Sequence, residues 1–229
     1  MDWGTLHLPI SPGTLPPALW ADAVVNRVLV VAMLAAALLV LRDYLRLWPL
    51  LCGCMVRSRG NLEIEHSLGM ARSRNRCGLV ALGILSLLAD RYGLWPAAFL
   101  SGIASGWRAA VLLGVAVAFL LLRAVMAVIF RKAKLDSEGR TAASHALWNY
   151  FLAVLPLMLL SVAAFWLFHV NDAAAKWTLW AELFVVLVLT LAREGQILRG
   201  KYFVLQTFLY LCGLELIPLA TLIAVAAVL

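Results

Sequence analysis

The sequence predicts an all-α polytopic membrane protein, a bundle of about six transmembrane helices with both termini on the non-cytoplasmic side. Of its 229 residues, 64% are hydrophobic and only 14% are charged. A soluble domain is typically about 45–50% apolar and about 25% charged. Long apolar segments recur along the chain, and basic residues gather in alternate loops between them. A soluble fold of this length cannot hide so much apolar surface, so lipid must cover part of it.

Six apolar segments are expected to form the transmembrane helices. In hydrocarbon an isolated strand would leave backbone N–H and C=O groups unpaired, and these segments lack the alternation of a barrel strand. A spanning helix needs roughly 20 apolar residues, which makes the second and fifth segments the least certain to cross. The segments are Ala23–Leu41, Cys77–Ala89, Ala109–Phe130, Ala146–Phe168, Trp177–Ala192 and Tyr202–Leu229.

The chain divides into a short non-cytoplasmic N-terminal segment, 1–22, and a single transmembrane domain, 23–229. The first segment is rich in proline and lacks the basic start of a signal peptide. A basic cytoplasmic loop covers 42–76, and its first part, Arg42–Val56, is expected to lie along the membrane surface as an amphipathic helix. The stretch Pro96–Gly106 is apolar but too short to span, so we expect a re-entrant or interfacial piece.

The distribution of Lys and Arg predicts the orientation. Cytoplasmic loops carry the excess of these residues. Of the 19, 14 fall in the loops after the first, third and fifth segments and 3 on the opposite side. The net charge of +7 is therefore mostly a topology signal, with anionic lipid headgroups rather than nucleic acid as the expected partner. Arginines of the first loop are candidates for contacts with lipid or a protein partner: Arg57, Arg59, Arg72, Arg74 and Arg76.

A short motif in the last segment resembles a known family. Residues 208–219 read FLYLCGLELIPL, which is similar to the C-terminal signature of a multi-pass membrane family of the Bacteroidota, domain of unknown function 4271. The basic patch 131–134 and the aromatic start of the fourth segment at 148–151 also resemble that family. The resemblance covers roughly residues 40–229. It implies a bacterial inner-membrane protein and supplies no reaction, ligand or catalytic residue.

Glu215 is the most conspicuous candidate for a functional residue. It lies between two long uncharged stretches, which places it near the middle of the bilayer. A carboxylate there costs about 3 kcal/mol on insertion scales, so it must be protonated, paired or facing a wet cavity. Pro218 lacks an N–H and frees the carbonyl of Leu214 beside it. The two residues form either a proton or cation site, or a neutral hydrogen-bonded carboxyl next to a kink.

Two further intramembrane charges are candidates. Arg123 lies about 10 Å from the cytoplasmic end of the third segment at 1.5 Å per residue, and either pairs with Glu215 or extends to the headgroups. Glu182 lies about one turn into the fifth segment. It is expected at the level of other polar residues on the outer side, which form either a cluster or ordinary interfacial residues: Arg27, Asp90, Arg91, His169 and Asp172.

Motifs for catalysis or metal binding are not evident. Glu65 and His66 lack a second cluster of ligands at metal-binding spacing. There is no phosphate-binding glycine loop, no nucleophile elbow and no HExxH motif. The four cysteines lie in or beside apolar segments and do not resemble a secreted disulfide framework. We therefore expect no catalytic residue, cofactor or metal.

The function expected from these features is that of a non-enzymatic inner-membrane protein. It would act as a subunit or assembly factor of an envelope complex, through other membrane proteins or self-association. One alternative is a small transporter, flippase or channel that uses an intramembrane carboxylate. A further alternative is a lipid-processing enzyme with its site on the cytoplasmic face.

Overall fold

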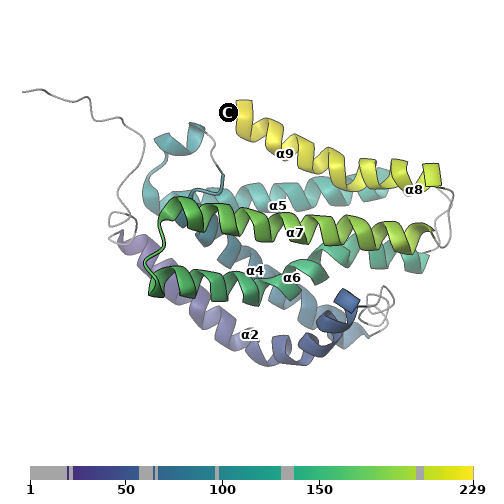
Figure 1. Cartoon of the computed structure of the whole chain (residues 1–229), viewed down its shortest axis with the longest axis horizontal. Coiled ribbons are helices and arrows are strands. Elements are labelled where there is room, and N and C mark those ends of the chain that lie inside the picture. Colours follow the sequence, from purple (N-terminus) through teal and green to yellow (C-terminus); the bar gives the residue numbers. More distant parts are fainter. Residues whose placement is uncertain are drawn as a thin grey trace, which may run out of the picture.

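The computed structural model describes residues 20, 23–56, 64, 67–95, 98–129, 137–199 and 204–228, and these contain helices and turns but no strand (Figure 1). The expectation of an all-α protein is confirmed over this part of the chain. The elements are α2 (Val24–Val56), α4 (Leu68–Tyr92), the 3-10 helix η1 (Ala98–Gly102), α5 (Ser105–Ile129), α6 (Ser137–Leu167), α7 (Asp172–Arg199), α8 (Val204–Leu211), the π-helical segment η3 (Cys212–Leu216) and α9 (Ile217–Val228).

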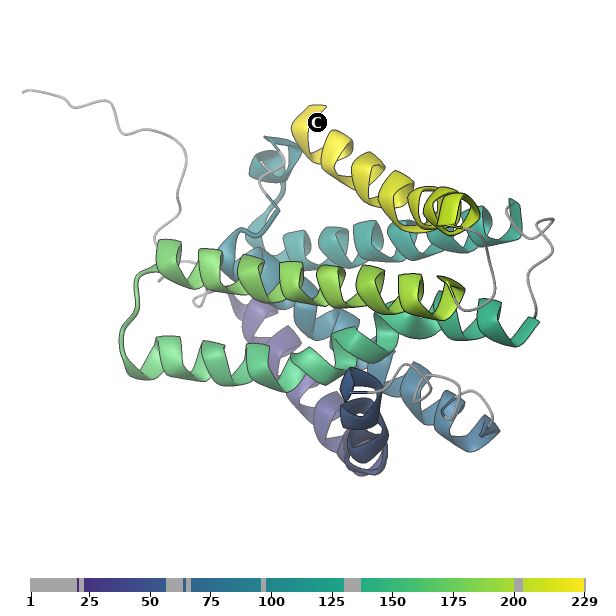
Figure 2. The ribbon, with the colours of Figure 1, turned by 45° about the vertical axis from the view of Figure 1, so that its right-hand side comes forward.

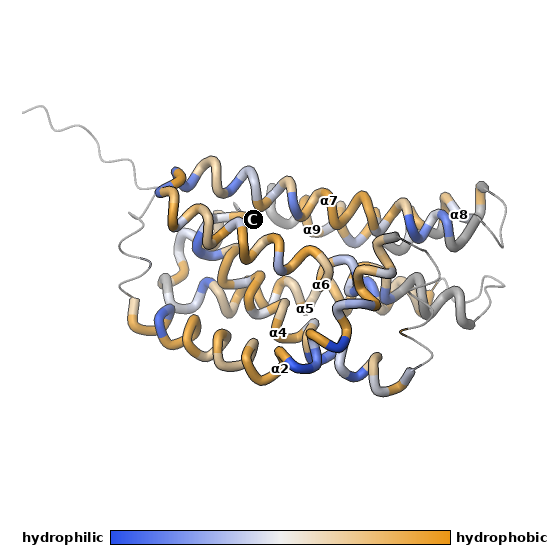
Figure 3. The backbone as a smooth tube through the Cα atoms, turned by 60° about the horizontal axis from the view of Figure 1, so that its bottom comes forward, coloured by the Kyte–Doolittle hydropathy of each residue, from blue (hydrophilic) through white to orange (hydrophobic). Residues whose placement is uncertain are grey.

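Four of the described helices are long and apolar enough to cross a membrane. These stretches are Val24–Met55, Gly106–Ile129, His145–Leu167 and Asp172–Gln196. The expected second segment lies in α4, which is long enough to cross but is not among these apolar helices. The last segment is divided among α8, η3 and α9, none of which is long enough by itself. The structure therefore supports a membrane protein with several spanning helices, while the number six remains a prediction. Figure 3 shows hydrophobic residues along much of α2, α5, α6 and α7.

Helix α2 differs from the expected transmembrane helix followed by a separate surface helix. It continues through all 33 residues, with Pro49 inside it. Figures 1 and 2 show that it changes direction along its length, as expected for a helix that contains proline. Leu47, Leu51 and Cys54 follow helical spacing and are completely buried. Because these residues pack in the protein core, the second half of α2 continues one long helix and is not a separate element, whereas its position along the membrane surface remains a prediction.

A tight turn makes α6 and α7 antiparallel neighbours (Figure 2). The N–H of Val170 donates to the carbonyl of Phe165, and His169 takes a left-handed φ of 50° at the end of α6. Histidine adopts this conformation more readily than most residues other than glycine. The Oδ1 atom of Asn171 then accepts a hydrogen bond of 2.7 Å from the N–H of Ala174 and caps α7.

A proline inside α6 creates a contact with α2. Pro156 has no N–H and leaves the carbonyl of Leu152 without its helical donor. The hydroxyl of Tyr44 donates to that carbonyl at 3.0 Å. Tyr150, which is completely buried, donates to the carbonyl of Cys54 at 3.5 Å. The two tyrosines thus tie α2 to α6 within the core.

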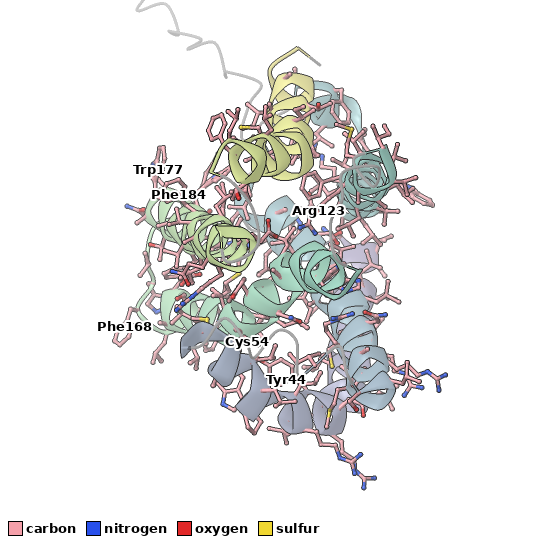
Figure 4. The ribbon with its side chains drawn as sticks, turned by 90° about the vertical axis from the view of Figure 1, so that its right-hand side faces the viewer. Tyr44, Cys54, Arg123, Phe168, Trp177 and Phe184 are labelled. Carbon is pink, nitrogen blue, oxygen red and sulfur yellow. The ribbon has the colours of Figure 1, made fainter. Side chains whose placement is uncertain are left out.

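The two ends of the bundle have different compositions. In Figure 1 the C-terminal ends of α2, α5 and α7 lie at one end, and the turn between α6 and α7 lies at the other together with η1. Trp107, Trp166 and Trp177 are largely exposed and lie near the helix ends of this second side. Exposed tryptophan is typical of the membrane–water interface. Figure 4 shows Phe168, Trp177 and Phe184 pointing away from the bundle.

Candidate functional site

A buried ion pair joins α5 to α7. The Nη2 atom of Arg123 donates to the Oε1 atom of Glu194 at 3.2 Å. The exposed fractions of the two side chains are 6% and 0%. Figure 4 shows Arg123 among the helices of the bundle. Removing one member of a buried pair leaves the other charge uncompensated, which costs about 3–5 kcal/mol. The folded state therefore needs both charged side chains, because each compensates the charge of the other within the apolar bundle.

Residues next to Glu194 connect α7 to two further helices. The Nη2 atom of Arg193 donates to the carbonyl of Met55 at 2.6 Å, in the last turn of α2. Such carbonyls have no partner within their own helix. A Cβ atom added to Gly195 would lie 3.7 Å from a methyl carbon of Leu211, so α7 also packs closely against α8 there. We call residues 193–195 the α7 junction, because they contact α2, α5 and α8.

Glu194 lies beyond the fifth apolar segment expected from the sequence. That segment ends at Ala192, which places the next residues in a loop, whereas α7 extends to Arg199. Arg123 is buried against Glu194 and does not extend to the headgroups. The helical spacing of residues in the sequence could have indicated that the helix continues to Glu194. The buried positions of α7 recur every three or four residues up to that point: Ala175, Leu179, Glu182, Val186, Thr190 and Glu194.

Glu215 lies in the π-helical segment η3, which packs against α5. Its side chain is outside the described residues, so its proposed pairing with Arg123 stays a prediction. The N–H of Ile217 donates to the carbonyl of Cys212, five residues earlier, and Pro218, which is buried, follows directly. A proline at this position cannot supply the next helical hydrogen bond. Such π segments are frequent at functional sites.

Glu182 lies on the same buried face of α7 as Glu194 and contacts α6. Its Oε1 atom accepts a hydrogen bond from the Ser161 hydroxyl at 2.5 Å. Its Oε2 atom is buried and has no hydrogen-bond partner among the described residues. Glu182 is 8% exposed, so a carboxyl with one uncommitted oxygen lies inside the bundle.

Most of the polar residues expected at the outer side lie near one another. The Nη2 atom of Arg91 is 3.4 Å from the Oδ1 atom of Asp172, and the guanidinium lies 5.2 Å from the centre of the Tyr92 ring. The indole of Trp20 donates to Asp90 at 2.8 Å. Burial raises the pKa of the Asp90 carboxyl, and the hydrogen bond from Trp20 partly opposes that change.

Several of these groups line an open cavity of about 880 Å³ at the ends of α2, α4 and α6. Arg91, Tyr92, His169 and Asp172 line it together with apolar residues of α2 and α6. Glu182, by contrast, contacts Ser161 and does not line this cavity. The arrangement combines charged groups and an apolar wall at one end of the bundle.

The arginines proposed for lipid or partner contacts differ in how exposed their side chains are. Arg57 and Arg59 lie outside the described residues. Arg72 is exposed, and Arg76 is largely exposed and pairs with Asp43 at 3.5 Å. Arg74 differs, because it is 1% exposed and its guanidinium donates to the side chain of Asn75. Arg74 therefore serves packing within the protein rather than contact with a headgroup.

Metal-binding residues do not gather in the part of the chain that the structure describes, where there is no group of three His, Cys, Asp or Glu suited to an ion. Glu65 and His66 lie outside that part. The four cysteines are free thiols.

Comparisons with known proteins do not assign the chain to a family. No family model matches it, and no curated protein or solved structure matches it either. The resemblance of residues 208–219 to domain of unknown function 4271 therefore remains a prediction.

Proposed function

We propose that this protein is a non-enzymatic subunit or assembly factor of a membrane complex, with six helices across the bacterial inner membrane and both termini outside. The proposal rests on the contacts that the buried charged side chains make between helices. Arg123 and Glu194 form a buried ion pair between α5 and α7, and Arg193 binds the end of α2. Charges engaged in this way hold helices together and favour a scaffold that works through its surface.

The arrangement of the helix ends supports the proposed orientation. Lys and Arg gather in the sequence at and after the C-terminal ends of α2, α5 and α7, and these ends lie together in Figure 1. The most exposed tryptophans, Trp107, Trp166 and Trp177, lie near helix ends at the opposite side. In this orientation the basic end faces the cytoplasm, where its arginines also attract anionic lipid.

Helix α9 offers the best surface for a partner helix. It packs mainly against α5 and η3, and it slopes away from α7 in Figure 1. Its exposed residues include Ala220 and Ala224, four positions apart. Small residues at this spacing let two helices approach closely in a membrane. We therefore place the partner, a second membrane protein or a second copy of the chain, against this face.

The test is photo-crosslinking in native membranes. A crosslinking amino acid at Ala224 should capture one protein in a fixed ratio, and the uncrosslinked complex should copurify in the same ratio. Leu34, which is 61% exposed on α2, provides the control position and should capture only lipid. If Ala224 and Leu34 both capture lipid alone and the chain purifies by itself, the proposal is wrong.

A second candidate function is a small transporter or channel for protons or cations. The uncommitted Oε2 atom of Glu182 favours it, and so does the π-helical segment around Glu215. Proteoliposomes loaded with a pH-sensitive dye would reveal it through a proton or sodium flux that Glu182→Gln abolishes. A wild-type flux equal to that of empty liposomes would exclude this function. The third alternative, a lipid-processing enzyme with its site on the cytoplasmic face, is favoured by no contact of the described residues.

A further inference from the structure

The cavity at the outer end of α2, α4 and α6 has two chemically different sides. Its apolar side includes Trp20, Val170 and residues from α2 and α6: Val30, Leu159, Val162, Ala163, Phe165 and Trp166. Its polar side consists of Arg91, Tyr92, His169 and Asp172. A volume of about 880 Å³ falls within the range of about 300–1,000 Å³ typical of small-molecule sites. A ligand that fills both sides must be amphipathic.

The position of the cavity matches the boundary between hydrocarbon and headgroups. Trp166 lines it and is 81% exposed, at the end of α6. Val30 and Leu159 also line it and are partly open to the surroundings of the bundle, which in a membrane are acyl chains. Aromatic side chains at this level are typical of the interface. A bilayer lipid can therefore reach the cavity from the side without leaving the membrane.

The charges of the polar side come as an adjacent pair of opposite sign. Arg91 and Asp172 are 3.4 Å apart, and Asp172 remains about half exposed. A headgroup that carries only negative charge would place a phosphate next to the carboxylate of Asp172. A headgroup with a phosphate and a primary ammonium can offer the phosphate to Arg91 and the ammonium to Asp172. A trimethylated ammonium has no N–H to donate to that carboxylate.

From this combination we propose that the cavity binds one phosphatidylethanolamine molecule of the adjacent leaflet. Its phosphate lies against the guanidinium of Arg91 and the imidazole of His169. Its ammonium donates to Asp172, and one acyl chain follows the wall formed by Leu159 and Ala163. Charge-assisted hydrogen bonds fix the headgroup, and apolar contacts hold the chain. This lipid site is independent of the proposed partner surface on α9.

The experiment is native mass spectrometry of the full chain after reconstitution in nanodiscs with equal amounts of phosphatidylethanolamine, phosphatidylglycerol and phosphatidylcholine. We expect the wild type to retain one phosphatidylethanolamine. Ala163→Trp fills the apolar side without changing any charge and should reduce the retained fraction at least fivefold. Arg91→Gln should reduce it similarly. Lys176→Gln removes a cation from the same end of α7, outside the cavity lining, and should have no effect.

Three results would overturn the proposal. One is equal retention of the three lipids, and another is unchanged retention in the Ala163→Trp variant. The third is complete displacement of the lipid by soluble O-phosphoethanolamine at equal concentration, because it would assign the site to a free phosphate compound. Ala163→Trp keeps the test decisive if Arg91→Gln fails to fold, because it leaves the Arg91–Asp172 pair intact.

Discussion

The Nη2 atom of Arg123 lies 3.2 Å from the Oε1 atom of Glu194, and both side chains are buried between α5 and α7. Arg123 is six residues from the end of α5 at Ile129, and Glu194 is five residues from the end of α7 at Arg199. At 1.5 Å per residue, both lie about 8–9 Å inside the same end of the bundle. The two parallel helices are therefore joined where they approach the basic side of the protein.

The orientation predicts the outcome of reporter fusions. Reporters after residues 60, 138 and 197 should be active in the cytoplasm, because each follows or precedes a basic stretch. Reporters near residues 98, 173 and 229 should be active on the outer side. The measurement is the ratio of alkaline phosphatase to fluorescent reporter activity at each site. Opposite results at any two sites would contradict the six-helix arrangement.

The hydrogen bond from Tyr44 to the carbonyl of Leu152 should depend on Pro156. Tyr44→Phe removes the donor and should lower the free energy of unfolding by about 1 kcal/mol. Pro156→Ala supplies an N–H to the same carbonyl, so Tyr44→Phe should cost less in that background. Thermal unfolding in detergent of the four proteins measures the difference. If Tyr44→Phe lowers the free energy of unfolding equally with and without Pro156, the proline does not create the free carbonyl that Tyr44 binds.

Two neighbouring arginines of α4 should respond differently to the same change. Arg74→Gln alters a buried guanidinium and its hydrogen bonds to Asn75, so it should lower stability by about 1–3 kcal/mol. Arg72→Gln, on an exposed residue, should leave stability unchanged and weaken binding to anionic liposomes. Thermal unfolding and liposome flotation separate the two roles. Equal effects of both variants on flotation would mean that Arg74 also reaches lipid.

Variants of Glu215 distinguish the scaffold function from the transporter function. Glu215→Gln keeps the size and hydrogen-bonding ability but cannot ionise, whereas Glu215→Ala loses both. For a scaffold we expect the Gln variant to keep normal abundance and partner capture, and the Ala variant to lose abundance. For a proton carrier, both variants should lose flux while the Gln variant stays folded. Immunoblot abundance, crosslinking at Ala224 and proton flux are measured side by side.

Much of the fold follows from hydropathy, but the helix ends do not. The apolar stretches around Arg123, Pro156 and Glu182 all lie in helices, as expected. Charged residues next to an apolar stretch were assigned to loops, which excluded Glu194 from α7. A charge can continue a transmembrane helix when another helix supplies its counter-charge, and a single sequence does not identify that partner. The continuation of α2 beyond Leu41 depends in the same way on tertiary packing.

The polar end of the bundle that contains Arg91 and Asp172 was partly predictable. Asp90 and Arg91 follow an apolar stretch directly, and Asp172 begins the helix after a short turn, so hydropathy places them at one level. Their pairing with specific residues depends on how α4 approaches the turn between α6 and α7. The position of α4 in turn depends on close contacts with α2, such as the one at Gly83, where an added Cβ would lie 2.6 Å from the sulfur of Met33. Hydropathy carries no information on such contacts.

The structural role of the intramembrane charges is tested most directly by a double-mutant cycle on Arg123 and Glu194, measured as thermal stability of the purified chain. Arg123→Gln and Glu194→Gln should each lower the free energy of unfolding by about 3 kcal/mol, because each leaves one buried charge without its partner. The double variant should be more stable than either single variant. Arg46→Gln, on an exposed residue of α2, should have little effect. Additive losses in the double variant would contradict a structural pair between α5 and α7.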